Sequence, residues 1–101
     1  MVNAARKIII DNEAKIALKE AYEYTKKDSF QNAEKVKTRI LKSIEELIKY
    51  PTKYPPDRFR MDKDICFRAY EIFRYRITYH VSDSEIRIIR IRHTSRNPLE
   101  Y

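Results

Sequence analysis

The hydrophobic period of this chain changes near its middle, and that change limits the folds open to it. Before residue 50, apolar side chains recur every three or four positions, which predicts helices. After residue 65 they alternate with polar ones, which predicts strands. The segment 51–60 between the two halves contains three prolines and predicts an extended connector. With 101 residues the chain has room for one core, so helices and strands must share it.

The first half predicts a short strand at 6–10 and then two antiparallel helices. The strand is rich in β-branched residues. Apolar spacing predicts one helix up to about residue 27 and another that ends before Pro51, because the residue before a proline avoids helical geometry. The residues that can cap these helices are Asp11 and Asn12 for the first and Asp28 and Ser29 for the second.

The second half predicts three strands, at 65–70, at 73–81 and from Glu85 to about His93, the last two joined by a short turn at 82–84. In the middle strand one face carries Phe73, Tyr75, Ile77, Tyr79 and Val81, and the other carries Arg74, Arg76, Thr78 and His80. In the last strand Ile86 and Ile88 share a face, whereas Ile89 and Ile91 share the opposite one. Either this strand is central and buried on both sides, or a bulge shifts its phase.

These elements predict an α+β fold in which one face of a sheet covers the apolar stripes of both helices. The opposite face then carries the row of Arg74, Arg76 and His80. That row is either a solvated surface or a recognition surface, and the pattern alone leaves both open.

Charge indicates an anionic partner, since the net charge is +7. Nine of eleven lysines lie in residues 1–50, but nine of eleven arginines lie in 51–101, and arginine is the residue for bidentate binding of phosphate and carboxylate. The single cysteine, Cys66, excludes an internal disulfide and a cysteine zinc cluster. Without glycine there is no phosphate-cradling loop, and His80 and His93 do not make a metal site. We expect no cofactor, no metal and, without a membrane-length apolar run, a cytoplasmic location.

Four motifs resemble the RelE/ParE superfamily of toxins, and together they span essentially the whole chain as one domain, 1–101. They are Asp28-Ser29 followed by Ala33, a second helix that ends near Leu47 and Pro51, the strand Tyr75-Arg76-Ile77-Thr78-Tyr79, and the ending Ile91-x-His93-x-x-Arg96. The resemblance implies a β-α-α-β-β-β fold with a helical hairpin on a curved, mainly antiparallel sheet. It also implies a toxin encoded beside a short antitoxin that wraps around it and neutralises it.

One activity that the resemblance implies is ribosome-dependent cleavage of messenger RNA, as in RelE-like members. This metal-free reaction needs a base, an acid and cations for the phosphorane. The candidate catalytic residues are Arg76, Arg96, Tyr101 and His93. A lysine pair of the family's nucleases aligns near Phe67 and Ala69, where this chain has no lysine, so the catalytic set is partial and an enzymatic activity stays open.

The other activity that the resemblance implies is the poisoning of DNA gyrase, as in ParE-like members. It requires a binding surface and no catalytic pair. The long helical hairpin, the absent lysines and the His93-x-x-Arg96 ending are closer to ParE, which we take as the first hypothesis. The candidate binding residues are Arg68, Arg74, Arg90 and Arg92. A degenerate, non-toxic protein that only binds an antitoxin is the third hypothesis.

Overall fold

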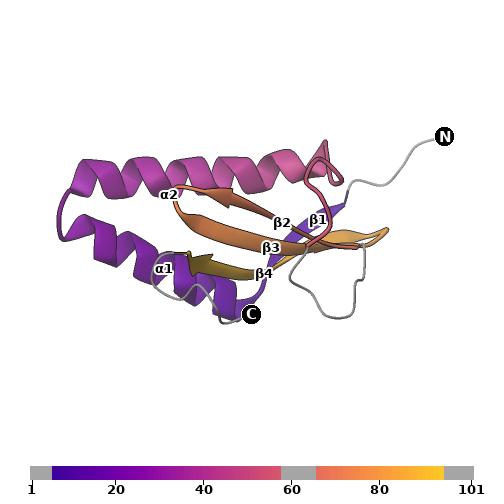
Figure 1. The fold of residues 1–101 in the computed structure, drawn as a ribbon, viewed down its shortest axis with the longest axis horizontal. Coiled ribbons are helices and arrows are strands. Elements are labelled where there is room, and N and C mark those ends of the chain that lie inside the picture. Colours follow the sequence, from indigo (N-terminus) through magenta and orange to yellow (C-terminus); the bar gives the residue numbers. More distant parts are fainter. Residues whose placement is uncertain (1–5, 58–65, 95–101) are drawn as a thin grey trace.

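The computed structural model describes residues 6–57 and 66–94 and shows two helices on one face of a four-stranded sheet (Figure 1). The elements are β1 (Lys7–Ile10), α1 (Asn12–Lys26), α2 (Phe30–Glu45), a 3₁₀ turn η1 (Glu46–Ile48), β2 (Phe67–Ile72), β3 (Tyr75–Val81) and β4 (Glu85–His93). The strand order is β1-β4-β3-β2, with β1 parallel to β4 and the other pairs antiparallel. The predicted α+β fold and element order are confirmed. Within the described residues, no helix is both long and apolar enough to span a membrane.

The two helices begin in different ways, although both follow a capping residue. Ser29 caps α2 in the usual manner, since its Oγ accepts a hydrogen bond of 3.0 Å from the backbone N–H of Asn32. Asp11 occupies the cap position of α1 but makes no side-chain cap bond. Its carboxylate accepts a hydrogen bond from Arg87 of β4 instead. The start of α1 is therefore tied to the sheet.

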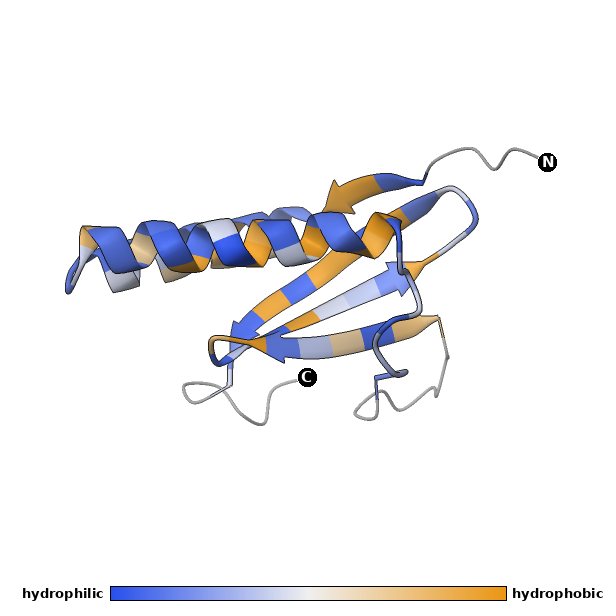
Figure 2. Ribbon diagram, turned by 90° about the horizontal axis from the view of Figure 1, so that it is seen from above, coloured by the Kyte–Doolittle hydropathy of each residue, from blue (hydrophilic) through white to orange (hydrophobic). Residues whose placement is uncertain are grey.

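The core lies between the helices and one face of the sheet. Figure 2 shows hydrophobic residues recurring along both helices and concentrated in β1 and parts of the other strands. The buried apolar cluster comprises Ala14, Ala21, Ile40, Ile44, Leu47, Tyr70, Tyr75, Ile77, Tyr79, Ile86, Ile88 and Ile91. Its helical members follow the predicted three–four spacing, because only that stripe of each helix faces the sheet.

A β-bulge resolves the ambiguous phase of the last strand. Thr78 pairs with Arg90, but the next residue of β3, Tyr79, pairs with Ile88. Ile89 is therefore an extra residue in β4, and the strand changes phase there. As a result Ile88 and Ile91 both reach the core. The bulge alternative is confirmed, and β4 is also central in the sheet.

The connection between β2 and β3 differs from the prediction. The strand expected at 73–81 begins at Tyr75, and the one expected at 65–70 is observed at Phe67–Ile72. Because Ile72 pairs directly with Tyr75, the turn consists of only Phe73 and Arg74. Both have positive φ, 53° and 66°, which costs about 1–3 kcal/mol for each residue with a side chain. The chain has no glycine to mark such a turn.

Tyrosines hold the connector that follows α2 against the sheet. The Tyr54 ring stacks on Tyr70 with centroids 4.2 Å apart. The Tyr79 hydroxyl donates to the carbonyl oxygen of Pro51 at 3.0 Å, and Arg68 Nη1 donates to that of Tyr54 at 2.6 Å. Further along, the backbone N–H of Asp57 donates to Phe67 at 2.7 Å. The connector thus reaches the outer edge of β2 and places Asp57 beside the sheet.

Candidate functional site

The face of the sheet turned away from the helices is rich in arginine. Tyr75 and Ile77 belong to the core, so Arg76 between them points to the opposite face. Direct cross-strand pairs share a face, which fixes the other members. These pairs are Arg76 with Arg92, Thr78 with Arg90, and His80 with Arg87. We call this side the arginine face.

Arg76 is buried within this face and is already paired. It is only 7% exposed. Its Nη2 lies 2.7 Å from Asp57 Oδ1, and its Nη1 lies 3.5 Å from Glu71 Oε2. The two carboxylates offset the repulsion of Arg92, which lies directly opposite on β4. Arg76 therefore joins the connector to the sheet.

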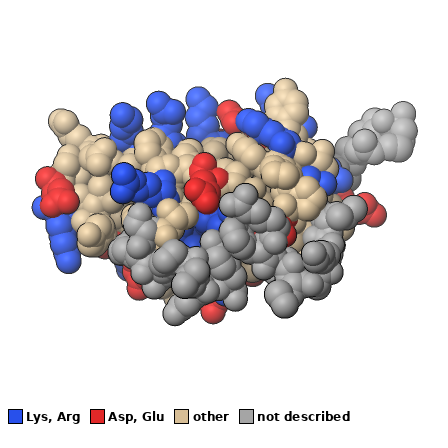
Figure 3. Space-filling model, viewed as in Figure 1, with Lys and Arg blue, Asp and Glu red and all other residues tan. Residues whose placement is uncertain are grey.

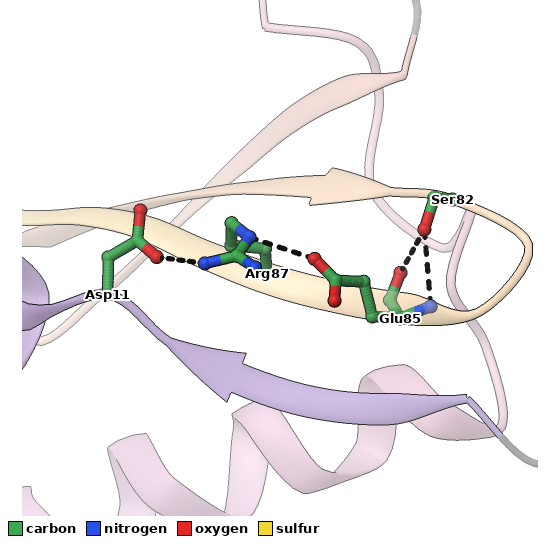
Figure 4. Close-up of polar contacts among 4 residues, drawn as sticks. All are labelled: Asp11, Ser82, Glu85 and Arg87. Carbon is green, nitrogen blue, oxygen red and sulfur yellow. Dashed lines mark hydrogen bonds and ion pairs between the residues drawn. The ribbon is translucent and has the colours of Figure 1, made fainter.

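Arg87 binds a second pair of carboxylates, at the end of the arginine face away from Arg76 (Figure 4). It donates to Asp11 Oδ1 at 2.6 Å and to Glu85 Oε2 at 2.8 Å. The hydrogen bond to Asp11, followed by that to Glu85, raises the pKa of Arg87 above its usual value. In the adjacent turn Ser82 Oγ donates to the Glu85 carbonyl oxygen and accepts from its N–H, both at 3.2 Å. This end of the sheet is held together by local polar contacts.

The structure separates two of the candidate catalytic residues. His93 pairs with Tyr75, so it lies toward the helix side, where the two rings meet edge to face at 5.0 Å. Arg76 points to the other side of the sheet. A base at His93 and a cation at Arg76 therefore do not converge on one point. Arg96 and Tyr101 lie outside the described residues, and their catalytic roles stay predictions.

The candidate binding arginines also divide among three places. Arg90 and Arg92 lie on the arginine face. Arg68 pairs with Tyr79 and lies on the helix side, where it binds the connector. Arg74 lies in the β2–β3 turn, and its carbonyl accepts hydrogen bonds from Thr94 N at 2.8 Å and Thr94 Oγ1 at 3.1 Å. The expected row of Arg74, Arg76 and His80 is thus wrong for Arg74, because β3 begins after it, at Tyr75.

Asp57, the main partner of Arg76, is not predicted by the pattern of the sequence. The residue lies in the proline-containing connector, 19 positions before Arg76, and nothing in the alternation of the strands points to it. A carboxylate directly after Pro55-Pro56, where the backbone is stiff, was the one available signal.

The helical layer carries a second charged surface. Figure 3 shows Lys and Arg side chains along the helices. A shallow hollow of about 390 Å³ on the hairpin is lined by Lys15, Leu18, Lys19, Tyr22, Glu23 and Lys37. The Lys37 Nζ lies 5.1 Å from the centre of the Tyr22 ring.

In the part of the chain that the structure describes, no group of acidic, histidine or cysteine side chains could hold a metal ion.

Comparison with known proteins agrees with this architecture. The family model described as "ParE toxin of type II toxin-antitoxin system, parDE" matches residues 8–98. A solved structure titled "Chromosomal ParDE TA system from P. aeruginosa" is similar with a TM-score of 0.68 and 18% identity, over 88% of this chain and 96% of that chain. At this identity the structural match shows a shared fold. No curated protein sequence matches significantly. Because the family model covers most of its length, the chain belongs to the ParE toxin family of type II toxin-antitoxin systems.

Proposed function

We propose that this ParE-family toxin inhibits growth by binding a protein target and that a cognate antitoxin neutralises it. The first candidate for the target is DNA gyrase. The observation that carries the proposal is the burial and ion pairing of Arg76. Its guanidinium is buried and paired with Asp57 and Glu71. Poisoning an enzyme by binding needs a stable surface and no free catalytic cation, which suits an arginine used to hold the fold together.

The same geometry weighs against a nuclease. Stabilising a phosphorane would require Arg76 to leave Asp57, and an unpaired buried charge costs about 3–5 kcal/mol. His93, the alternative base, lies toward the other side of the sheet. The lysines of the family's nucleases are absent at Phe67 and Ala69. Each point favours binding over RNA cleavage.

The antitoxin has two candidate docking surfaces on this chain. An acidic segment would complement Arg90 and Arg92 on the arginine face. An amphipathic helix would instead cover Leu18 and Tyr22 in the hollow of the helical hairpin. The P. aeruginosa structure is of a ParDE system, which supports an antitoxin partner but does not decide between these surfaces.

Two assays run side by side test the proposed target. Purified toxin is added to gyrase with supercoiling and DNA cleavage as readouts, and to translating ribosomes with mRNA cleavage as the readout. We expect inhibited supercoiling without mRNA cleavage. Arg90→Glu should weaken the inhibition, whereas Lys42→Glu, an equal change of charge on α2, should not.

The other results point to the other hypotheses. Cleavage of mRNA without an effect on gyrase would support the ribosome-dependent nuclease. Expression that is harmless without an antitoxin, together with inactivity in both assays, would support a degenerate antitoxin-binding protein.

A further inference from the structure

The backbone of the β2–β3 turn is strained, although other residues at these two positions would adopt the same turn without strain. Phe73 and Arg74 both have positive φ. Asn-Gly adopts such angles readily and is the common choice for a two-residue turn. In the described residues these are the only two non-glycine positions with positive φ. Strain that a simple substitution would remove indicates that the two side chains serve a purpose other than folding.

Both side chains of this turn face solvent from a rigid base. Phe73 is 42% exposed, and Arg74 is exposed as well. Across residues 6–57 and 66–94, the Arg74 guanidinium makes no hydrogen bond or ion pair. Thr94 binds the Arg74 carbonyl through both its N–H and its hydroxyl, which holds the turn against the end of β4. An aromatic ring and a guanidinium are therefore presented together, without the entropic cost of ordering a loose loop.

The chemistry around the turn fits nucleic acid better than a protein surface. A protein interface has an apolar centre of several residues. Here one aromatic ring lies beside arginine, on a chain of net charge +7 whose arginines are concentrated in this half. A lone aromatic ring that stacks on or wedges between bases, with an arginine on the phosphates, is a recurring arrangement for binding DNA.

We propose that the Phe73–Arg74 turn is a contact element for duplex DNA, in which Phe73 packs against a base step and Arg74 binds a phosphate. The proposal rests on the gyrase-directed function, and it adds that the toxin touches the DNA held by its target. Toxin bound to both the protein and the DNA would resist release of the cleaved duplex.

The decisive variant relaxes the turn and removes both side chains. Phe73→Asn with Arg74→Gly should raise Tm by about 5 °C, since it relieves the strain. The same variant should bind a fluorescent duplex of about 20 base pairs at least tenfold more weakly in an anisotropy titration. The matched control is Phe30→Ala with Arg39→Ala, which removes an exposed aromatic ring and one positive charge from α2 and should leave DNA affinity within about twofold.

The gyrase assay then separates this inference from the proposed function. If the relaxed variant is more stable and loses both DNA binding and gyrase poisoning, the inference holds. If the relaxed variant binds duplex DNA as tightly as the parent does, or if the parent binds single-stranded RNA but not duplex DNA, the turn is not a DNA contact. If the variant loses DNA binding but poisons gyrase as the parent does, the toxin does not use the turn on the DNA held by gyrase, and that part of the inference is overturned. Should the parent bind DNA through the turn but leave gyrase unaffected, the gyrase target is wrong and the DNA contact stands.

Discussion

Both faces of the sheet contain buried side chains, but these side chains are stabilised by different forces. On the helix side, Ile77 and Tyr79 pack without exposure against apolar residues of α1 and α2. On the arginine face, Arg76 and Thr78 are almost as deeply buried, but Arg76 is compensated by Asp57 and Glu71. Apolar burial stabilises through contact area with many neighbours. Charged burial depends on a few specific partners, and loss of one leaves the other uncompensated.

The comparison predicts the largest loss for a truncation on the helix side. Ile77→Ala should lower the free energy of unfolding by about 3–4 kcal/mol, because the side chain is fully buried and a cavity would remain. Urea denaturation followed by circular dichroism measures it. Ile16→Ala is the control, since this side chain is 56% exposed and should change stability by less than about 0.5 kcal/mol. Equal losses at the two positions would mean that the core is not where the structure places it.

The next largest effect is expected on the arginine face, and it should be non-additive. Arg76→Met should cost about 3 kcal/mol, because Asp57 stays buried without its main cation. Adding Asp57→Leu should restore most of that stability, since two apolar side chains of similar size then replace the pair. A double-mutant cycle in urea measures the coupling. Strictly additive single losses would contradict the role of Asp57 as the partner of Arg76.

The same contrast explains how far the sequence could predict the structure. Alternation along 75–81 was sufficient to assign Tyr75, Ile77 and Tyr79 to the core, because apolar burial leaves a periodic signal. The pairing of Arg76 with Asp57 leaves no such signal, since Asp57 lies outside the strands and 19 positions before Arg76. The turn at Phe73–Arg74 was missed for a related reason: its residues are not those that its backbone angles favour.

High pH should weaken the helix side by a moderate amount. Burial raises the pKa of Tyr79 from its usual value of 10 to about 12, and burial raises the pKa of Tyr70 as well. The folded state therefore holds these protons more tightly than the unfolded state. The resulting stability, on the order of 2 kcal/mol for Tyr79, is complete below pH 10 and is lost as the pH rises to about 12.

Tyr79→Phe tests this titration directly. At neutral pH it should cost only about 1 kcal/mol, the value of the lost hydrogen bond to the Pro51 carbonyl. Between about pH 9 and 12 its free energy of unfolding should fall less steeply than that of the parent. A parallel fall in both proteins would show that other groups cause the alkaline loss.

The smallest loss of stability is expected for substitution of Arg87. It shows that the burial of an ion pair matters more for stability than the length of its hydrogen bond. Arg87 donates to Asp11 at 2.6 Å, a shorter contact than the 2.7 Å between Arg76 and Asp57. Its side chain is nevertheless 42% exposed, so water competes for both partners and dissolved salt screens them. Arg87→Ala should lower Tm slightly at low ionic strength and hardly at all in about 1 M NaCl, whereas Arg76→Met should lower it in both. If Arg87→Ala remained as damaging as Arg76→Met at high salt, exposure would not be the property that distinguishes these two clusters.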